Sequence, residues 1–148
     1  MTSRIVVSAV CVFSREGWLL TVRKRGTERF MHPGGKPEQG ESAAEAASRE
    51  LAEEVGIDVE PDALEYVGFW VARAANEAGT DIEATVFSAP GVHDPAEISA
   101  SAEIAELRWL DLGAELPADL APLLTDHVLP ALASARGWEP SEKSANPE

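Results

Sequence analysis

The sequence contains little cysteine: Cys11 is the only one among its 148 residues. No intrachain disulfide can form, which is typical of a protein from a reducing compartment. The residues around Cys11 alternate in the manner of a strand, which favours a buried structural thiol over a nucleophile. The chain also lacks any apolar run near the roughly 18 residues that cross a membrane. We therefore expect a cytoplasmic protein that has no membrane as a partner.

Positive charge is scarce as well. The chain has 12 Lys and Arg residues against 26 Asp and Glu residues, and its net charge is −14. Nucleic acids and anionic membranes would be repelled by such a protein, so neither is expected as a general partner. An anionic ligand can still bind if cations or a local basic patch mediate the contact. Four of the twelve basic residues lie in RKRGTER (23–29).

What remains is the composition of an ordinary globular protein, with 45% apolar and 26% charged residues. No linker or repeat divides it, so we expect one domain over residues 1–137 and a polar, disordered tail over 138–148. The segment IVVSAVCVF (5–13) has one basic residue before it and no cleavage signature after it. It therefore reads as a first strand and not as a secretory signal.

The rest of the chain predicts an α/β fold with a mixed sheet packed between helices. The strand at 5–13 and a second strand at 18–24 are separated by turn residues, which predicts a hairpin. Residues 90–103 are expected to form a surface loop. Two helices are predicted, one from about Ala43 to Val55 and one over 118–135 that Pro122 would bend. Further strands are expected at 57–59, 64–73, 82–89 and 105–112.

The first helix lies in the segment GGKPEQGESAAEAASRELAEEVGI (34–57). Ser42 and Glu45 have the spacing of a capping box, and Gly56 is placed to end the helix. At about 100° per residue, one stripe of this helix is apolar and faces the core. Beside it lies an arc of glutamates. The stripe consists of Ala44, Ala47, Leu51 and Val55, and the arc of Glu50, Glu53 and Glu54.

Like charges so close on a helix repel one another, so the glutamate arc needs an explanation. A solvated acidic face is one interpretation. Against it, an acidic patch near a helix C-terminus has the wrong sign for the helix dipole. Arg49 is spaced to pair with Glu45 and Glu53, which would orient a carboxylate. Carboxylates beside a glycine-rich loop offer the oxygen ligands that hard divalent cations prefer, and this predicts a magnesium site.

Several residues in this segment have fixed spacing: Gly35, Glu41, Arg49-Glu50-Leu51, Glu53-Glu54 and Gly56-Ile57. This pattern resembles the signature of the Nudix hydrolases, and every fixed position of that signature is filled. EIAELRWLDL (103–112) is similar to a downstream strand of the family, and the resemblance extends over roughly residues 4–135. It implies an α/β/α sandwich. His32 departs from the pattern, because the family commonly has a bulky apolar residue there. We interpret it as a partly buried loop residue, with a substrate contact as the alternative.

The resemblance implies a pyrophosphohydrolase that cleaves a nucleoside diphosphate linked to another moiety. Mg²⁺, or Mn²⁺ in its place, would be bound by Glu50, Glu53, Glu54 and the carbonyl of Gly35. The implied catalytic residues are Glu50, Glu53, Glu54 and Arg49, with Glu41 and Arg49 bracing the loop against the helix. The general base varies in the family, so Glu103 and Glu106 are further candidates. The implied substrate-binding residues are Gly34, Gly35, Arg23 and Arg25, although the two arginines also fit a charged strand edge that blocks aggregation.

The substrate itself is less well indicated. The ADP-ribose branch of the family tends to have a proline about fifteen residues beyond the motif, where this chain reads VARAAN (71–76). This weakly favours a nucleoside triphosphate, including damaged ones, over ADP-ribose or a nucleotide sugar. A catalytically silent nucleotide-binding module and an acidic calcium-binding protein are the competing hypotheses. A small nucleotide is the expected partner, no nucleic acid is expected, and a homodimer stays open.

Overall fold

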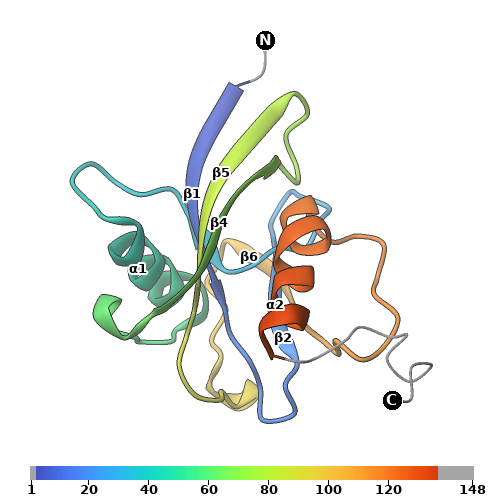
Figure 1. Ribbon diagram of the computed structural model, residues 1–148. Coiled ribbons are helices and arrows are strands. Elements are labelled where there is room, and N and C mark those ends of the chain that lie inside the picture. The colour runs from blue at the N-terminus through green and yellow to red at the C-terminus, as the bar shows by residue number, and fades with distance from the viewer. Residues whose placement is uncertain (1–2, 137–148) are drawn as a thin grey trace.

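The computed structural model describes residues 3–136 (Figure 1). The predicted tail over 138–148 lies outside the described residues. Within the described part of the chain, no helix is long and apolar enough to cross a membrane. The elements, in chain order, are β1 (Ser3–Cys11), β2 (Leu19–Lys24), β3 (Gly34–Gly35), α1 (Ala43–Val55), η1 (Pro61–Ala63), β4 (Glu65–Arg73), β5 (Thr80–Ser88), η2 (Pro95–Glu97), β6 (Ile104–Leu110), η3 (Leu124–Val128) and α2 (Leu129–Arg136).

A four-stranded mixed sheet forms the centre of the molecule, with strand order β3-β1-β5-β4. Strands β1 and β5 are parallel, whereas β3 and β4 pair antiparallel to their neighbours. Helix α1 lies on one side of these strands and α2 on the other (Figure 1). The core accordingly has two parts, one on each face of the sheet. Neighbouring residues of β1 point into different parts, since Val10 packs in the cluster of Leu51 and Cys11 in the cluster of Leu124. The α/β/α sandwich and the burial of Cys11 are thus confirmed.

Strands β2 and β6 form a separate antiparallel pair, so the predicted hairpin between the first two strands is confirmed only next to its turn. There an antiparallel bridge joins Phe13 and Leu19, the Leu20 N–H donates to the Val12 carbonyl, and the Ser14 N–H donates to the Trp18 carbonyl. The reason lies in β1 itself. β5 takes one of its edges over its full length and β3 takes the other at Ser8 and Ala9, so β2 pairs elsewhere.

The predicted strand at 57–59 is also wrong. Ile57 is buried beneath α1, as its apolar character suggests, but the segment is a loop that leads into η1. The Ser48 hydroxyl donates to the Val59 carbonyl at 2.6 Å, so this carbonyl is satisfied without a neighbouring strand.

The second predicted helix is present, but its irregularity lies elsewhere than predicted. Helical residues run over 122–136, and Pro122 is the first of them, a position where its missing N–H is not needed. The irregular segment is the π-helical turn η3, in which the Leu129 N–H donates to the Leu124 carbonyl five residues back. Pro130 follows directly and has no N–H for the Asp126 carbonyl, which gives a physical reason for the wider turn.

Helix α1 agrees with its prediction in detail. The Ser42 side chain accepts from the Glu45 N–H, the Glu45 side chain accepts from the Ser42 N–H, and Gly56 is left-handed with φ 76°. Its first carbonyl, that of Ala43, accepts a bond from the Ser8 hydroxyl of β1 at 2.8 Å. Both helix ends and the helix face are therefore fixed, and the glutamates hold a defined position relative to β1 and β3.

Candidate active site

The glycine pair of β3 lies between strand β1 and helix α1, and each glycine is required by a close approach. A Cβ on Gly34 would collide with the Ser8 carbonyl, and a Cβ on Gly35 would collide with the Glu50 carboxylate. Glycine is the residue that lets a backbone come this near to other groups. The loop can therefore bring its backbone up to the carboxylates of α1, as its composition suggested.

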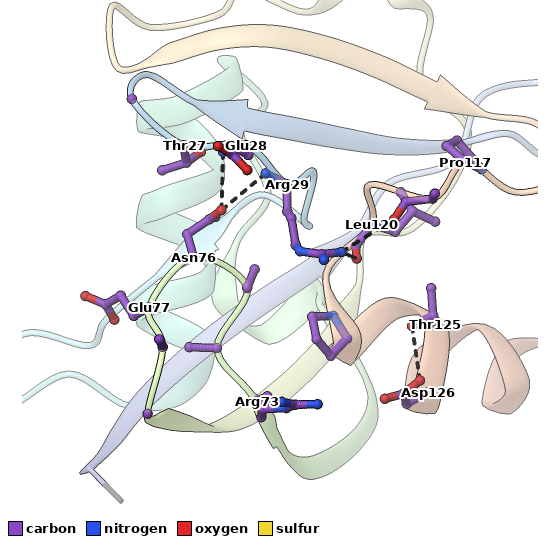
Figure 2. Close-up of a pocket in the computed structure, with 17 residues that line it drawn as sticks. Thr27, Glu28, Arg29, Arg73, Asn76, Glu77, Pro117, Leu120, Thr125 and Asp126 are labelled. Atoms are coloured by element: carbon purple, nitrogen blue, oxygen red, sulfur yellow. Dashed lines mark hydrogen bonds between the residues drawn. The ribbon is translucent and has the colours of Figure 1, made fainter.

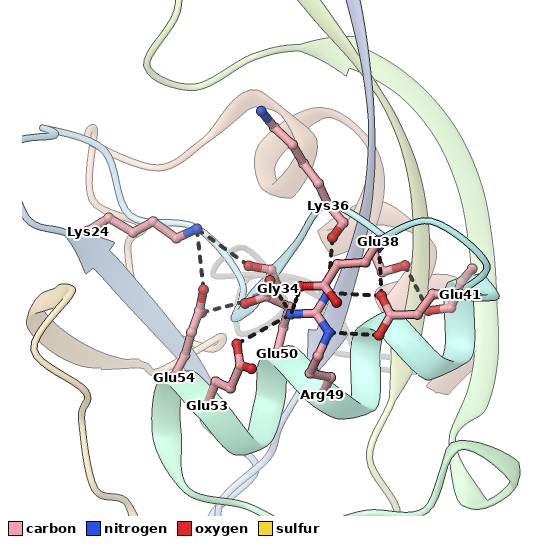
Figure 3. Close-up of polar contacts among 11 residues, drawn as sticks. Lys24, Gly34, Lys36, Glu38, Glu41, Arg49, Glu50, Glu53 and Glu54 are labelled. Carbon is pink, nitrogen blue, oxygen red and sulfur yellow. Dashed lines mark hydrogen bonds and ion pairs between the residues drawn. The ribbon is translucent and has the colours of Figure 1, made fainter.

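Arg49 organises the outer part of the site. Its guanidinium donates twice to the Glu41 carboxylate, from Nε at 2.7 Å and from Nη2 at 2.9 Å, and so ties the loop to α1 (Figure 3). Nη1 is 3.1 Å from Glu50 and 3.3 Å from Glu53. We call Arg49, Glu41, Glu50 and Glu53 the Arg49 cluster. The bonds from Arg49 lower the pKa of Glu41 to about 2, and those from Glu41 and Glu50 raise the pKa of Arg49.

The predicted bracing of the loop by Glu41 and Arg49 is confirmed, and so is the pair of Arg49 with Glu53. The predicted pair of Arg49 with Glu45 is wrong, because the Glu45 carboxylate is engaged in the capping box. In its place Arg49 reaches the loop, where Nη2 donates to the Lys36 carbonyl and Nη1 lies 3.9 Å from Glu38.

Glu54 has a different environment. Its side chain is only 2% exposed, and it faces strand β2 and the glycine pair (Figure 3). Oε1 accepts from the Gly34 N–H at 3.2 Å, and Oε2 lies 3.3 Å from Lys24 Nζ. Burial raises the pKa of Glu54 to about 7, with Lys24 and the Gly34 N–H acting in the opposite direction. Beyond this ion pair, Oε2 has no hydrogen-bond partner among residues 3–136, so a buried oxygen atom can still accept a bond.

The three glutamates of the predicted metal site do not point at one spot. Glu50 and Glu53 face Arg49, whereas Glu54 faces Lys24. Accordingly, among residues 3–136 no group of three or more His, Cys, Asp or Glu side chains is arranged to hold a metal ion. The donors nevertheless suit a hard divalent cation: they are all oxygens, Glu54 has an acceptor without a hydrogen bond, and the side-chain-free Gly35 lies against Glu50.

Glu50 and the glycine pair border a cavity of about 780 Å³, which Glu53 and Glu54 do not line. We call it the motif cavity. Its lining includes polar and charged residues, namely Lys24, Gly34, Gly35, Arg49, Glu50 and Glu103. It also includes apolar residues, among them Val7, Ala9, Ile82 and Leu123. A ligand with an anionic group and a flat apolar group would find a matching surface for each.

The basic strip of the sequence is divided by the alternation of β2. Lys24 lines the motif cavity, whereas Arg23 and Arg25 are not among its lining residues. Arg23 bonds to Glu106 at 3.0 Å and to the Thr27 carbonyl at 2.7 Å, and Arg25 donates to the Ala102 carbonyl at 2.9 Å. Both arginines are thus engaged by the protein's own groups.

A second cavity, of about 830 Å³, adjoins the motif cavity and shares residues of the β4–β5 connection with it. Asn76 in that connection accepts from the backbone N–H groups of Glu28 and Arg29, and Arg29 donates to the Leu120 carbonyl (Figure 2). These bonds link three loops to one another. None of the motif glutamates lines the second cavity, whereas Glu50 lines the motif cavity, so we place the site in the motif cavity.

His32 also lines the motif cavity, next to the glycine pair. It was expected to be partly buried, and it is buried more fully than that, with 3% of its surface exposed. Burial lowers the pKa of His32 to about 4, so its ring is neutral near pH 7. Its Nε2 has no hydrogen-bond partner among the described residues.

Comparison of the sequence with protein-family models shows the family of the chain. The family model of the NUDIX domain matches residues 2–132, which is most of the chain. The chain belongs to the Nudix family. It is accordingly a Nudix pyrophosphohydrolase, and its substrates belong to the nucleoside-diphosphate-linked class. Among curated proteins, no sequence matches it.

Solved Nudix structures resemble the chain over most of its length. The solution structure of the Escherichia coli ORF135 protein is 28% identical, with a TM-score of 0.67 over 91% of this chain and 92% of that one. The MutT protein from Methanosarcina mazei Go1 is 25% identical, with a TM-score of 0.62 over 80% and 88%. A bifunctional NMN adenylyltransferase/ADP ribose pyrophosphatase from Francisella tularensis, complexed with AMP and a Mn ion, is 20% identical, with a TM-score of 0.60 over 83% and 39%. At that identity, it shows the fold alone.

The helix in the Nudix segment is predicted correctly from the sequence, but two residues that contact its side chains are not. Lys24 was counted only as part of the basic strip, although it is the ion-pair partner of Glu54. Glu38, at the edge of the Arg49 cluster, was missed because its place in a glycine-rich loop has no periodicity to read.

Proposed function

We propose that this Nudix enzyme hydrolyses the pyrophosphate linkage of small nucleoside-diphosphate compounds with Mg²⁺, or Mn²⁺, as its cofactor. Glu50, Glu53, Glu54 and the carbonyl of Gly35 would hold the metal. The observation that carries the proposal is the motif cavity, whose wall combines Glu50, the glycine pair and Lys24. A divalent cation supplies charge neutralisation for the phosphate groups as negative charge builds up during their cleavage.

The chain's own residues supply positioning and proton transfer. The backbone of Gly34 and Gly35 and the ammonium group of Lys24 lie where they can orient a diphosphate in the cavity. Water attacks one phosphorus atom, a P–O bond forms, and the bond from that phosphorus to the bridging oxygen breaks. The leaving phosphate keeps the electron pair, and a carboxylate accepts the proton of the water.

Two carboxylates are proposed for the role of proton acceptor. Glu53 is on the motif helix and 61% exposed, so water reaches it. Glu103 lines the cavity from the loop before β6. Glu106, the other distal candidate, is paired with Arg23. Arg49 acts through the carboxylates that it orients, so we propose it as a positioning residue.

Within the substrate class we favour a nucleoside triphosphate, including damaged ones, and keep ADP-ribose or a nucleotide sugar as the alternative. The missing proline in the segment 71–76 supports the first. The manganese and AMP bound by the Francisella tularensis protein agree with a divalent metal and a nucleotide ligand. A silent nucleotide-binding module is the less favoured function, because all motif glutamates are present. Arg23 and Arg25 stay proposed as contacts to an outer phosphate.

We also keep the proposal of a cytoplasmic enzyme, supported by the single cysteine. A homodimer is supported by exposed apolar side chains such as Phe69 and Val71 on β4, which is an edge strand. Light scattering at several concentrations tests the assembly.

The function is tested with a panel of (deoxy)nucleoside triphosphates, ADP-ribose, a nucleotide sugar and a 5′-triphosphorylated RNA oligomer at matched salt. Each is assayed with Mg²⁺, with Mn²⁺ and with chelator, and products are identified by chromatography. We expect metal-dependent cleavage of a small nucleotide. The same titration should raise the melting temperature, because a ligand of the folded state stabilises it. Binding without cleavage would favour the silent module, and the RNA as best substrate would contradict the charge argument.

A further inference from the structure

His32 combines three properties that rarely occur together. It is 3% exposed, its Nε2 has no hydrogen-bond partner among the described residues, and it is one of the residues that line the motif cavity. A buried polar nitrogen without a partner is a cost to the folded state. An apolar side chain would avoid this cost at the same place. The imidazole is thus poorly explained by stability and needs another reason.

The cavity offers that reason. His32 lies between Met31 and the glycine pair in the sequence, and Met31, His32, Gly34 and Gly35 all line the motif cavity. Val7, Ile82 and Leu123 provide a surface suited to a flat, weakly polar ring, while Lys24 and Glu50 lie on the charged part of the wall. A nucleotide whose phosphates occupy the charged part would bring its base toward the apolar part, and toward the ring of His32.

We propose that His32 is a specificity-determining residue, which selects substrates by a hydrogen bond from its ring to an edge group of the nucleobase. This inference rests on the proposed function. A neutral imidazole has one N–H donor and one acceptor nitrogen, so it can read either a carbonyl or an amino group. Nε2 is covered in this structure, but rotation about the Cβ–Cγ bond is soft and can turn a nitrogen toward the cavity.

The discrimination follows from the buried position. A base that offers a hydrogen-bond partner satisfies the buried ring nitrogen, whereas a base without such a partner at its edge leaves both groups unpaired. The expected selectivity is about 10- to 100-fold in kcat/KM between matching and mismatched bases. It should reside mainly in KM, because the contact lies away from the bond that breaks.

The test compares the wild type with His32→Phe, which keeps a ring but removes both nitrogens, and with His32→Gln, whose amide nitrogen or oxygen can take the place of Nε2. His93→Leu is the matched control, because it removes an imidazole from a loop outside the motif cavity. We measure kcat and KM for nucleoside triphosphates with different bases, and the melting temperature of each protein. His32→Leu replaces His32→Phe if the latter does not fold.

We expect His32→Phe to fold with unchanged or higher stability and to lose the preference among bases, through a rise in KM for the favoured nucleotide. His32→Gln should recover part of the preference, and His93→Leu should match the wild type. Unchanged ratios of kcat/KM in His32→Phe, with an active wild type, would overturn the inference and leave the proposed function intact. If the wild type cleaves no nucleotide, the proposed function fails and the inference fails with it.

Discussion

Glu41 and Glu54 are both carboxylates held by a basic side chain, yet their pKa values are shifted in opposite directions. Glu41 lies at the rim of the site, where two bonds from Arg49 lower its pKa to about 2. Glu54 lies on the buried face of α1, where burial raises its pKa to about 7 although Lys24 is 3.3 Å away. A fork of two good hydrogen bonds to an accessible carboxylate outweighs desolvation, and one ammonium at a buried carboxylate does not.

The comparison gives the two regions different tasks. The Arg49 cluster is satisfied by the protein itself, since each of its carboxylates has a hydrogen bond from the guanidinium. Glu54 keeps an oxygen without a hydrogen bond, in a place where a negative charge is costly. A divalent cation would remove that cost. The Arg49 cluster therefore fixes the loop against α1, and the buried carboxylate of Glu54 is the group that a bound metal ion would stabilise most.

The largest effect is expected on turnover. Glu54→Gln should reduce kcat/KM by about 100-fold or more, because loss of a metal ligand removes several kcal/mol of charge stabilisation. Glu50→Gln should act in the same direction. The control is Glu45→Gln, which makes the same charge change on α1 but keeps the capping box. Wild-type kinetics for Glu54→Gln and Glu50→Gln at moderate Mg²⁺ would remove both from the metal site.

The two regions differ in how much of their structure could be predicted from the sequence. The Arg49 cluster could be predicted in part, because helical spacing indicates the pair of Arg49 with Glu53 and the resemblance to the Nudix family implies the contact of Arg49 with Glu41. The environment of Glu54 could not. Helical spacing gives the direction of a Cβ but not the side-chain rotamer, and Lys24 comes from a strand 30 residues earlier.

The same limit explains the fold. The strand-like composition of the sequence placed β4, β5 and β6 within two residues of their bounds. Strand pairing depends on segments that are distant in sequence, and a local pattern does not show which of them will pair. The sequence therefore predicted that β2 pairs with β1, although β3 and β5 occupy both edges of β1. The buried, unpartnered ring of His32 likewise depends on segments from elsewhere in the chain, and no local pattern records it.

The second effect tests the rim. Arg49→Met should lower the free energy of unfolding by about 2–3 kcal/mol, because it removes charged hydrogen bonds and leaves three carboxylates close together. Urea unfolding of the metal-free protein measures it. Arg49→Lys is the matched control, because it keeps the charge but cannot form the two parallel hydrogen bonds to Glu41. Its free energy of unfolding should lie between those of the wild type and Arg49→Met. If Arg49→Met is as stable as the wild type, the Arg49 cluster does not brace the loop against α1.

The smallest effect is a pH dependence of stability that is almost hidden in the wild type. Glu54 has a folded pKa of about 7 against an ordinary value of 4.5, so the folded protein binds its proton more tightly. Its contribution to stability is present below pH 4.5 and is lost as pH rises to 7. His32 has a folded pKa of about 4 against 6.5, so its contribution is present above pH 6.5 and is lost as pH falls to 4.

Between about pH 4.5 and 6.5 the two slopes have opposite signs and nearly cancel, each being up to about 1.4 kcal/mol per pH unit. Removing one group should expose the other. The stability of metal-free Glu54→Gln minus that of the wild type should rise with pH, while the same difference for His32→Phe should fall with pH. Titrating groups that do not interact with Glu54 or His32 drop out of both differences. Urea unfolding at pH 4.5, 5.5 and 6.5 measures the slopes. Two parallel curves would mean that neither side chain is protonated differently on folding, and the contrast between the buried site and its rim would then rest on geometry alone.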